Sequence, residues 1–345
     1  MGSLADLKPF LERHDYSGAK ELLESILTTA QGMERFFALM HLVTPLKQLV
    51  LYDEAAQCLE QAEALADEMG VTLPDQHWLF ISMHWENLGF PERVTALRVR
   101  LRNRDIAVGP FVWMQRRVDY AIGVLRVVER YDVKVLAVGQ NCLPDALAIR
   151  WGFNTVRVEG PFTAGVFNRD GVAMALEDDF ARFHDPKAFK VHPTAAGILS
   201  ASLAGYYTIF NHELGPWWVE DDCQRIRDLY TRRIDTFLRG MRSDAVLCVC
   251  TRINPMNVER LYQGLKARLK PGGRMRLLVL DFLANNPVDP ATLTEPDNVR
   301  VVPTAYPGPD YVWHMRNHFD TPGGFGFEQV IADAMLDEFL KLRPL

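Results

Sequence analysis

One of the five cysteines stands where a nucleophile would be placed. Cys142 follows an apolar, β-branched run, 133–138, that is typical of a buried strand. Gly139 ends this run, and Pro144 suits the first turn of a following helix. Cys142 is therefore expected at a strand-to-helix turn, where the helix dipole and unpaired N–H groups favour a thiolate. The pattern predicts either a reactive cysteine or a small side chain buried under a tight turn.

A catalytic cysteine needs a base within hydrogen-bonding reach and usually a third group to orient that base. Three of the nine histidines are candidates on position alone. His212 follows a strand-like run, 206–211, whereas His314 and His318 lie in a polar loop. Four others, in the N-terminal third, are expected to be structural or exposed: His14, His41, His77 and His84.

The last two thirds of the chain predict an α/β domain over residues 109–345. Strands are expected at 133–138, 155–158, 245–250, 275–280 and 299–303, and helices at 111–130, 144–150, 221–241, 257–269 and 327–340. Alternating strands and helices with short links are typical of a mainly parallel sheet. The segments 178–183 and 198–210 give mixed patterns that favour neither helix nor strand.

Ligands gather at the carboxyl ends of such strands. Arg252, Asn254 and Asp281 are expected at these ends, together with Cys142. Asn141 and the first N–H groups of the helix after Cys142 would hold an oxyanion. The predicted substrate-binding residues are therefore Gln140, Asn141, Glu213, Arg252 and Asn254.

Residues 1–108 predict a domain made of helical hairpins, with helices from residue 4 to about 105. Tyr16, Tyr52 and Phe90 each stand at a turn before a helix, 36 and 38 residues apart. This spacing is close to the tetratricopeptide (TPR) period of about 34 residues, so the array is expected to be TPR-like. Stacked hairpins leave a concave face that binds peptides or proteins. The alternative is an array that only caps the second domain or makes a dimer contact.

The composition is typical of a globular protein, with 48% hydrophobic and 24% charged residues. A net charge of −6 argues against nucleic acid as a partner, because phosphate neutralisation needs a basic face. No apolar run is long enough for a membrane span, and the first residues lack a secretory signal. The number and spacing of the cysteines predict neither a disulfide framework nor a zinc site. We expect a cytoplasmic protein without a metal or cofactor.

Four short motifs resemble landmarks of a bacterial family of papain-like cysteine peptidases of unknown function. They occur in the family's order and at suitable spacing: Val138-Gly-Gln-Asn-Cys142, Gly160-Pro-Phe162, Asn211-His-Glu213 and Arg232-Arg-Ile-Asp-Thr-Phe237. The resemblance covers roughly residues 132–315 and none of the helical array. It implies Cys142 as nucleophile and His212 as base, and Arg252 matches an arginine at a strand end.

The chain departs from the family pattern at two places. Thr163-Ala164 replaces an Asp-Trp pair, and Glu213 replaces the aspartate that follows the histidine. These differences leave the third member of a catalytic triad open, and His314 or His318 remains an alternative base.

Other functions fit the sequence less well. Residues 269–281 resemble a late strand of S-adenosylmethionine methyltransferases. Such enzymes also need a glycine-rich loop after their first strand, whereas 138–142 offers only Gly139 and lies too far upstream of residues 269–281. An SGNH-like esterase site with cysteine in place of serine would use Arg252 and Asn254. The non-enzyme alternative is a scaffold whose α/β domain is a degenerate enzyme. The sequence favours thiol-dependent hydrolysis or acyl transfer on an amide or ester.

Overall fold

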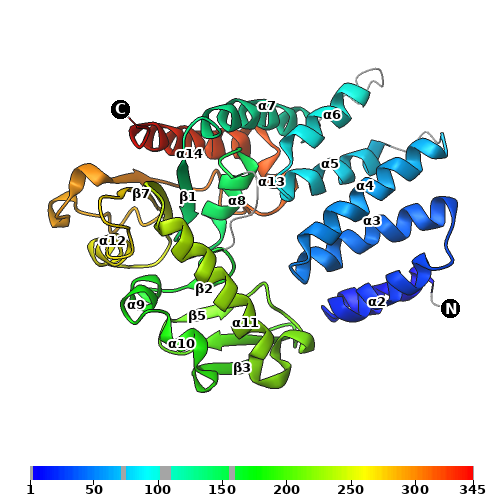
Figure 1. The fold of residues 1–345 in the computed structure, drawn as a ribbon, viewed down its shortest axis with the longest axis horizontal. Coiled ribbons are helices and arrows are strands. Elements are labelled where there is room, and N and C mark those ends of the chain that lie inside the picture. The colour runs from blue at the N-terminus through cyan, green and yellow to red at the C-terminus, as the bar shows by residue number, and fades with distance from the viewer. Residues whose placement is uncertain (1–2, 71–74, 102–109, 155–159, 345) are drawn as a thin grey trace.

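The computed structural model describes residues 3–70, 75–101, 110–154 and 160–344 of the chain. It shows a mixed α/β protein with two four-stranded sheets and a succession of helices at its N-terminal end (Figure 1). The strand predicted at 155–158 lies outside the described residues. Within those residues, no helix combines the length and the apolar character needed to cross a membrane.

The N-terminal third is helical throughout its described part. Consecutive helices pack on one another, as α2 does on α3 and α3 on α4, and their apolar faces enclose one core that includes Leu23, Phe36 and Trp85. Local signals start the helices: the Asp15 side chain, for example, accepts a hydrogen bond from Gly18 N (2.9 Å) at the start of α2. The helices are η1 (Leu4–Leu7), α1 (Lys8–Glu12), α2 (Tyr16–Leu27), α3 (Gly32–Gln48), α4 (Tyr52–Glu68), α5 (Asp75–Asn87) and α6 (Pro91–Leu101).

The predicted parallel sheet is present, with strand order β1-β6-β7-β8 and every pair parallel. Its strands are β1 (Val133–Ala137), β6 (Ala245–Arg252), β7 (Arg274–Asp281) and β8 (Val299–Pro303). The register pairs Ala137 with Val249 and Arg252 with Asp281, so the carboxyl ends of the strands lie along one edge. β1 is an outer strand and pairs only with β6 among the described strands.

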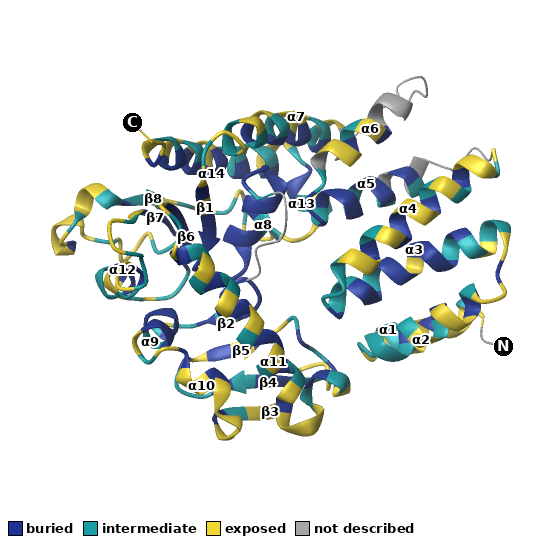
Figure 2. Ribbon diagram, in the orientation of Figure 1, coloured by how far each residue is buried: buried dark blue, intermediate teal, exposed yellow. Residues whose placement is uncertain are grey.

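Helices cover both faces of this sheet, which explains why its strands are apolar runs rather than alternating ones. Val135 and Leu247 face a core shared with α7 (Pro110–Val128), α8 (Leu143–Arg150) and α14 (Pro322–Lys341). Leu136 and Cys248 face the opposite core, to which α11 (Pro216–Met241) and α12 (Val258–Lys266) contribute. Figure 2 shows β1 and α8 as buried elements at the centre of the molecule. Short helices η3 (Pro290–Thr292), η4 (Pro296–Asn298) and α13 (Arg316–Phe319) lie in the connections.

The second sheet is antiparallel, in the order β2-β5-β4-β3, and was not anticipated from the sequence. It uses β2 (Val166–Phe167), β3 (Phe189–Pro193), β4 (Leu199–Leu203) and β5 (Thr208–Phe210), with α9 (Gly171–Glu177), α10 (Ala181–His184) and η2 (Pro186–Ala188) between β2 and β3. Aromatic side chains hold it on α11: Tyr230 stacks on Phe183 at 5.1 Å between ring centroids and meets Phe210 edge-on at 4.8 Å.

The helix expected over 221–241 differs at its start. It begins at Pro216, and residues 220–223 interrupt it with non-helical backbone, three of them at positive φ. The regular part after this break carries the apolar face, including Ile226 and Phe237, that was recognised in the sequence. The last helix is also longer than the predicted 327–340, because Thr321 caps an earlier start by accepting a hydrogen bond from Gly324 N (3.0 Å).

Helix α7 belongs to two cores. Met114 and Val118 complete the core of the N-terminal helices, whereas Val124 lies in the core against the parallel sheet. Arg117, on the same helix, is fully buried and forms ion pairs with Glu86 of α5 (2.6 Å) and with Asp320 (2.6 Å). The helical array is thus tied to the α/β part by a shared helix and a buried ion-pair network.

Candidate functional site

The turn after β1 places Cys142 at the N-terminus of α8. Gln140 N donates to Thr251 O (3.1 Å), which extends the pairing with β6 beyond the end of β1. The Asn141 side-chain oxygen accepts hydrogen bonds from Leu143 N (3.1 Å) and Thr251 Oγ1 (2.9 Å). Asn141 therefore fixes the start of α8 to the neighbouring strand, and Cys142 is the residue that precedes the first helical position.

Gly139 allows this turn to pass close to β6. A Cβ atom at residue 139 would lie 2.4 Å from Thr251 Oγ1 and 2.6 Å from Thr251 N. We expect Gly139→Ala to displace the turn, lower the free energy of unfolding by about 1–3 kcal/mol and slow alkylation of Cys142. The measurements are urea unfolding and thiol labelling at fixed pH. Gly123→Ala, at an exposed helical position with no neighbouring atom within 4 Å, is the control and should be neutral or slightly stabilising. Equal behaviour of the two variants would contradict the steric role of Gly139.

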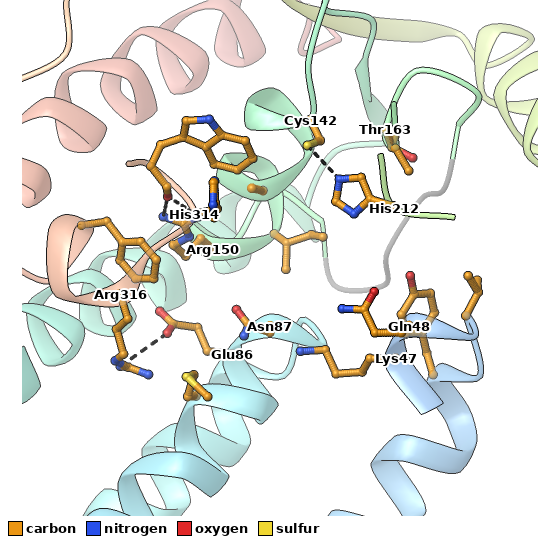
Figure 3. A pocket seen from close by; sticks show the side chains of 18 of the residues that line it. Lys47, Gln48, Glu86, Asn87, Cys142, Arg150, Thr163, His212, His314 and Arg316 are labelled. Atoms are coloured by element: carbon orange, nitrogen blue, oxygen red, sulfur yellow. Dashed lines mark hydrogen bonds and ion pairs between the residues drawn. The ribbon is translucent and has the colours of Figure 1, made fainter. Parts of the chain in front are cut away.

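His212 lies beside the thiol. Its Nε2 is 3.2 Å from Cys142 Sγ, although the two residues are 70 positions apart (Figure 3). The loop that carries His212 follows β5, and the residues directly after His212 hold this loop in place. Glu213 is buried and accepts a hydrogen bond from Arg233 Nη1 of α11 (2.7 Å), and Gly215 N donates to Leu199 O (2.8 Å). The thiol thus follows a strand of the parallel sheet, and the imidazole follows a strand of the antiparallel sheet.

The two alternative histidines occupy other positions. His318 Nδ1 accepts a hydrogen bond from Val312 N (3.2 Å), so its ring is part of a local turn. His314 lines the same cavity as Cys142, but burial, followed by the charges of Arg150 and His318, lowers its pKa. Of the three candidate bases, the structure brings His212 into contact with the sulfur.

A cavity of about 360 Å³ opens in front of Cys142 and His212. The α/β part of its wall includes Thr163 and Trp313, and the wall opposite comes from the ends of α3 and α5 and the start of α4. Figure 3 shows Lys47, Gln48 and Asn87 on the array side of this space. The candidate site therefore lies between the helical array and the α/β part, an arrangement that the sequence did not reveal.

The predicted substrate-binding residues mostly serve to build the site. The Gln140 side chain is fully buried, and its oxygen accepts hydrogen bonds from Ile253 N (2.8 Å) and Asn254 N (2.7 Å) while its nitrogen donates to Arg169 O (2.9 Å). Arg252 is buried against Asp281 (2.7 Å). The Asn254 amide nitrogen donates to Asn168 Oδ1 (2.9 Å).

Of the five predicted substrate-binding residues, only Glu213 is among the described residues that line the cavity. Gln140, Asn141, Arg252 and Asn254 do lie at the carboxyl edge of the sheet, but their side chains join neighbouring segments there. Their position in the sequence predicts the edge and not the direction of the side chain.

Several residues near the thiol are not among the site residues predicted from the sequence. Thr163 is buried, lines the cavity and donates to Gly160 O (2.8 Å), and Arg233 holds Glu213. Tyr306, beyond β8, lies close to Cys142 and Asn141: burial raises the pKa of its hydroxyl, the Asn141 side chain offsets part of that rise, and the thiolate charge adds to it. The Arg232-Arg233 pair was visible as a motif; no local pattern marks Tyr306.

Fold and site together define a mixed α/β protein with a cysteine–histidine pair at the carboxyl edge of a parallel sheet, under a helical array. No family model matches the chain, and no curated protein or solved structure matches it. Any function must therefore be argued from the residues around Cys142.

Proposed function

We propose that the protein is a thiol-dependent hydrolase or acyltransferase that acts on an amide or ester through Cys142 and His212. The observation that carries this proposal is the 3.2 Å contact between Cys142 Sγ and His212 Nε2 at a helix N-terminus beside a cavity. A thiol, a base in hydrogen-bonding reach and space for a carbonyl group are the elements that covalent acyl transfer requires.

In the proposed reaction, His212 takes the thiol proton and the Cys142 sulfur attacks the carbonyl carbon. The positive end of the α8 dipole stabilises the oxyanion, since Leu143 N already donates to Asn141 Oδ1 (3.1 Å) and Pro144 has no N–H. The C–N or C–O bond of the substrate breaks as the protonated His212 returns the proton to the leaving group. Water or another acceptor then attacks the thioester, and His212 takes its proton, so that the free thiol is restored when the product leaves.

The resemblance to papain-like cysteine peptidases supports the same assignment. Three of its four motifs contribute side chains to one cavity, which Cys142, His212 and Arg233 all line. Thr163, which stands where the family has aspartate, lies in the same wall. Within this proposal the TPR-like array covers the site. The alternative is a scaffold in which the array binds a partner protein or peptide and the α/β part has lost its activity.

The test is selective alkylation of the five cysteines at pH 7. Burial raises the pKa of Cys58 to about 11 and raises the pKa values of Cys223, Cys248 and Cys250 as well. We expect substoichiometric iodoacetamide to label Cys142 ahead of these four, because the thiolate is the reactive form. The measurement is mass spectrometry of the digested protein.

Cys142→Ser should remove this labelling while preserving the thermal unfolding midpoint to within a few degrees, since one atom changes. If Cys142 reacts no faster than Cys58 or Cys223, the scaffold alternative becomes the better description.

A further inference from the structure

We infer that the helical array forms a wall of the active site and selects substrates whose acyl group is short and carries a carboxylate. This inference rests on the proposed function of Cys142 and His212 and specifies the substrate class of that site.

The array touches both segments that carry the reacting groups. Helix α5 packs on α8, which follows Cys142. His14 lies against the loop that follows His212, where a Cβ atom on Gly215 would be 2.7 Å from the His14 carbonyl oxygen. In the same array, Lys47 and Gln48 at the end of α3 face the space in front of Cys142 (Figure 3). A bound acyl group would therefore contact side chains of the array as well as the thiol.

Cationic side chains outnumber carboxylates among the described residues that line the cavity. The cavity is lined by four cationic residues, Lys47, Arg150, Arg233 and Arg316, and by two carboxylates, Glu86 and Glu213. The carboxylates that balance two of the arginines lie behind the wall: Glu328 pairs with Arg150, Asp320 pairs with Arg316 (2.7 Å), and both acidic side chains are fully buried. A ligand in the cavity would meet the guanidinium groups before the buried carboxylates.

Two histidines support a positive local potential: His314 lines the cavity, and His84, which does not line it, contacts the Lys47 amino group (3.3 Å). The pKa of His84 is lowered well below its ordinary value, first by burial and then by the charges of Lys47 and Arg316. His314 shows the same direction from burial, Arg150 and His318. In both cases neighbouring cations add to the effect of burial and make a further positive charge unfavourable. The same field favours a negative group on a ligand.

The size and the remaining walls of the cavity define the rest of the substrate. A volume of about 360 Å³ is near the lower end of the range for small-molecule sites, roughly 300–1,000 Å³. Ile149, Trp313 and Phe319 give part of the wall an apolar surface. These features fit an amide or ester of a short acid with a second carboxylate better than an extended peptide.

The test compares two alkylating agents of nearly equal size, iodoacetate and iodoacetamide, on the full chain. Iodoacetate carries a carboxylate and iodoacetamide does not. For the wild-type protein, the ratio of the iodoacetate rate to the iodoacetamide rate at Cys142 should exceed the ratio for free cysteine and should fall as salt is added. Lys47→Gln should lower the ratio roughly fivefold, and Lys47→Glu should lower it further, because each reduces the positive charge near the reagent.

Lys20→Gln is the matched control, since Lys20 is an array lysine paired with Glu24 (2.6 Å) that does not line the cavity. Its ratio should equal that of the wild type. A reactive Cys142 with a ratio no higher than that of free cysteine, or one insensitive to Lys47, would overturn the inference and leave the proposed function standing. A Cys142 that reacts slowly with both reagents would overturn both. If a Lys47 variant fails to fold, the wild-type ratio and its salt dependence decide the question.

Discussion

Replacing His212 with alanine is expected to slow iodoacetamide labelling of Cys142 about tenfold at pH 6 and to move the pH dependence of labelling upward. Without the imidazole 3.2 Å away, the ionisation of the sulfur should move towards that of an ordinary thiol, near pH 8.5. The thiolate fraction at pH 6 then falls, but a more basic thiolate is a better nucleophile, which offsets part of the loss. The rate profile between pH 5 and 9 measures both effects.

His192→Ala provides the matched control for this experiment. His192 lies in β3, an outer strand of the second sheet, and does not line the cavity. Its profile should superimpose on that of the wild-type protein. An unchanged midpoint in His212→Ala would show that the close contact does not control the ionisation of Cys142, and the assignment of His212 as the base would have to be abandoned.

Replacing Arg117 with leucine should cost about 3–5 kcal/mol of folding free energy. The guanidinium is fully buried between Glu86 (2.6 Å) and Asp320 (2.6 Å), and its loss leaves two buried carboxylates without that countercharge. Urea unfolding measures the change. Arg93→Leu is the control: Arg93 and Glu60 also form an ion pair in the array, but both side chains are about half exposed, so the cost should stay below about 1 kcal/mol.

The loss in Arg117→Leu should also depend on pH. Burial already raises the pKa of Asp320 in the wild-type protein, with Arg117 opposing that rise. Removing Arg117 raises the folded-state pKa further above the unfolded value. An acid with a raised folded pKa costs stability above that pKa, so the variant should regain part of its stability as the pH falls through it. A variant within 1 kcal/mol of wild type at pH 7 would show that the array is not held by this network.

The sequence predicted the surroundings of Cys142 because local patterns determine them. A strand buried on both faces must be apolar along its length, and Pro144 marks the start of the next helix, so 133–150 could be read as strand, turn and helix. The parallel order of β1, β6, β7 and β8 follows from the alternation with helices.

The pairing with His212 could not be predicted from such local patterns. It depends on the second sheet, whose strands β2 and β5 have two and three residues, too few to show a period of two. Side-chain direction was equally hidden: Gln140 and Arg252 lie at the expected edge but point into internal contacts. The array wall depends on how distant helices pack, which no single segment encodes.

The separation of the two reacting groups along the chain has a consequence for biosynthesis. The ribosome completes the array first, then the strand and turn that carry Cys142, and only 70 residues later His212. β1 has no partner among the described strands until β6 is made, since its register begins with Val133 beside Ala245. The nascent chain therefore carries a thiol without its base until residue 212 has been added, and β1 gains its neighbouring strand only after β6.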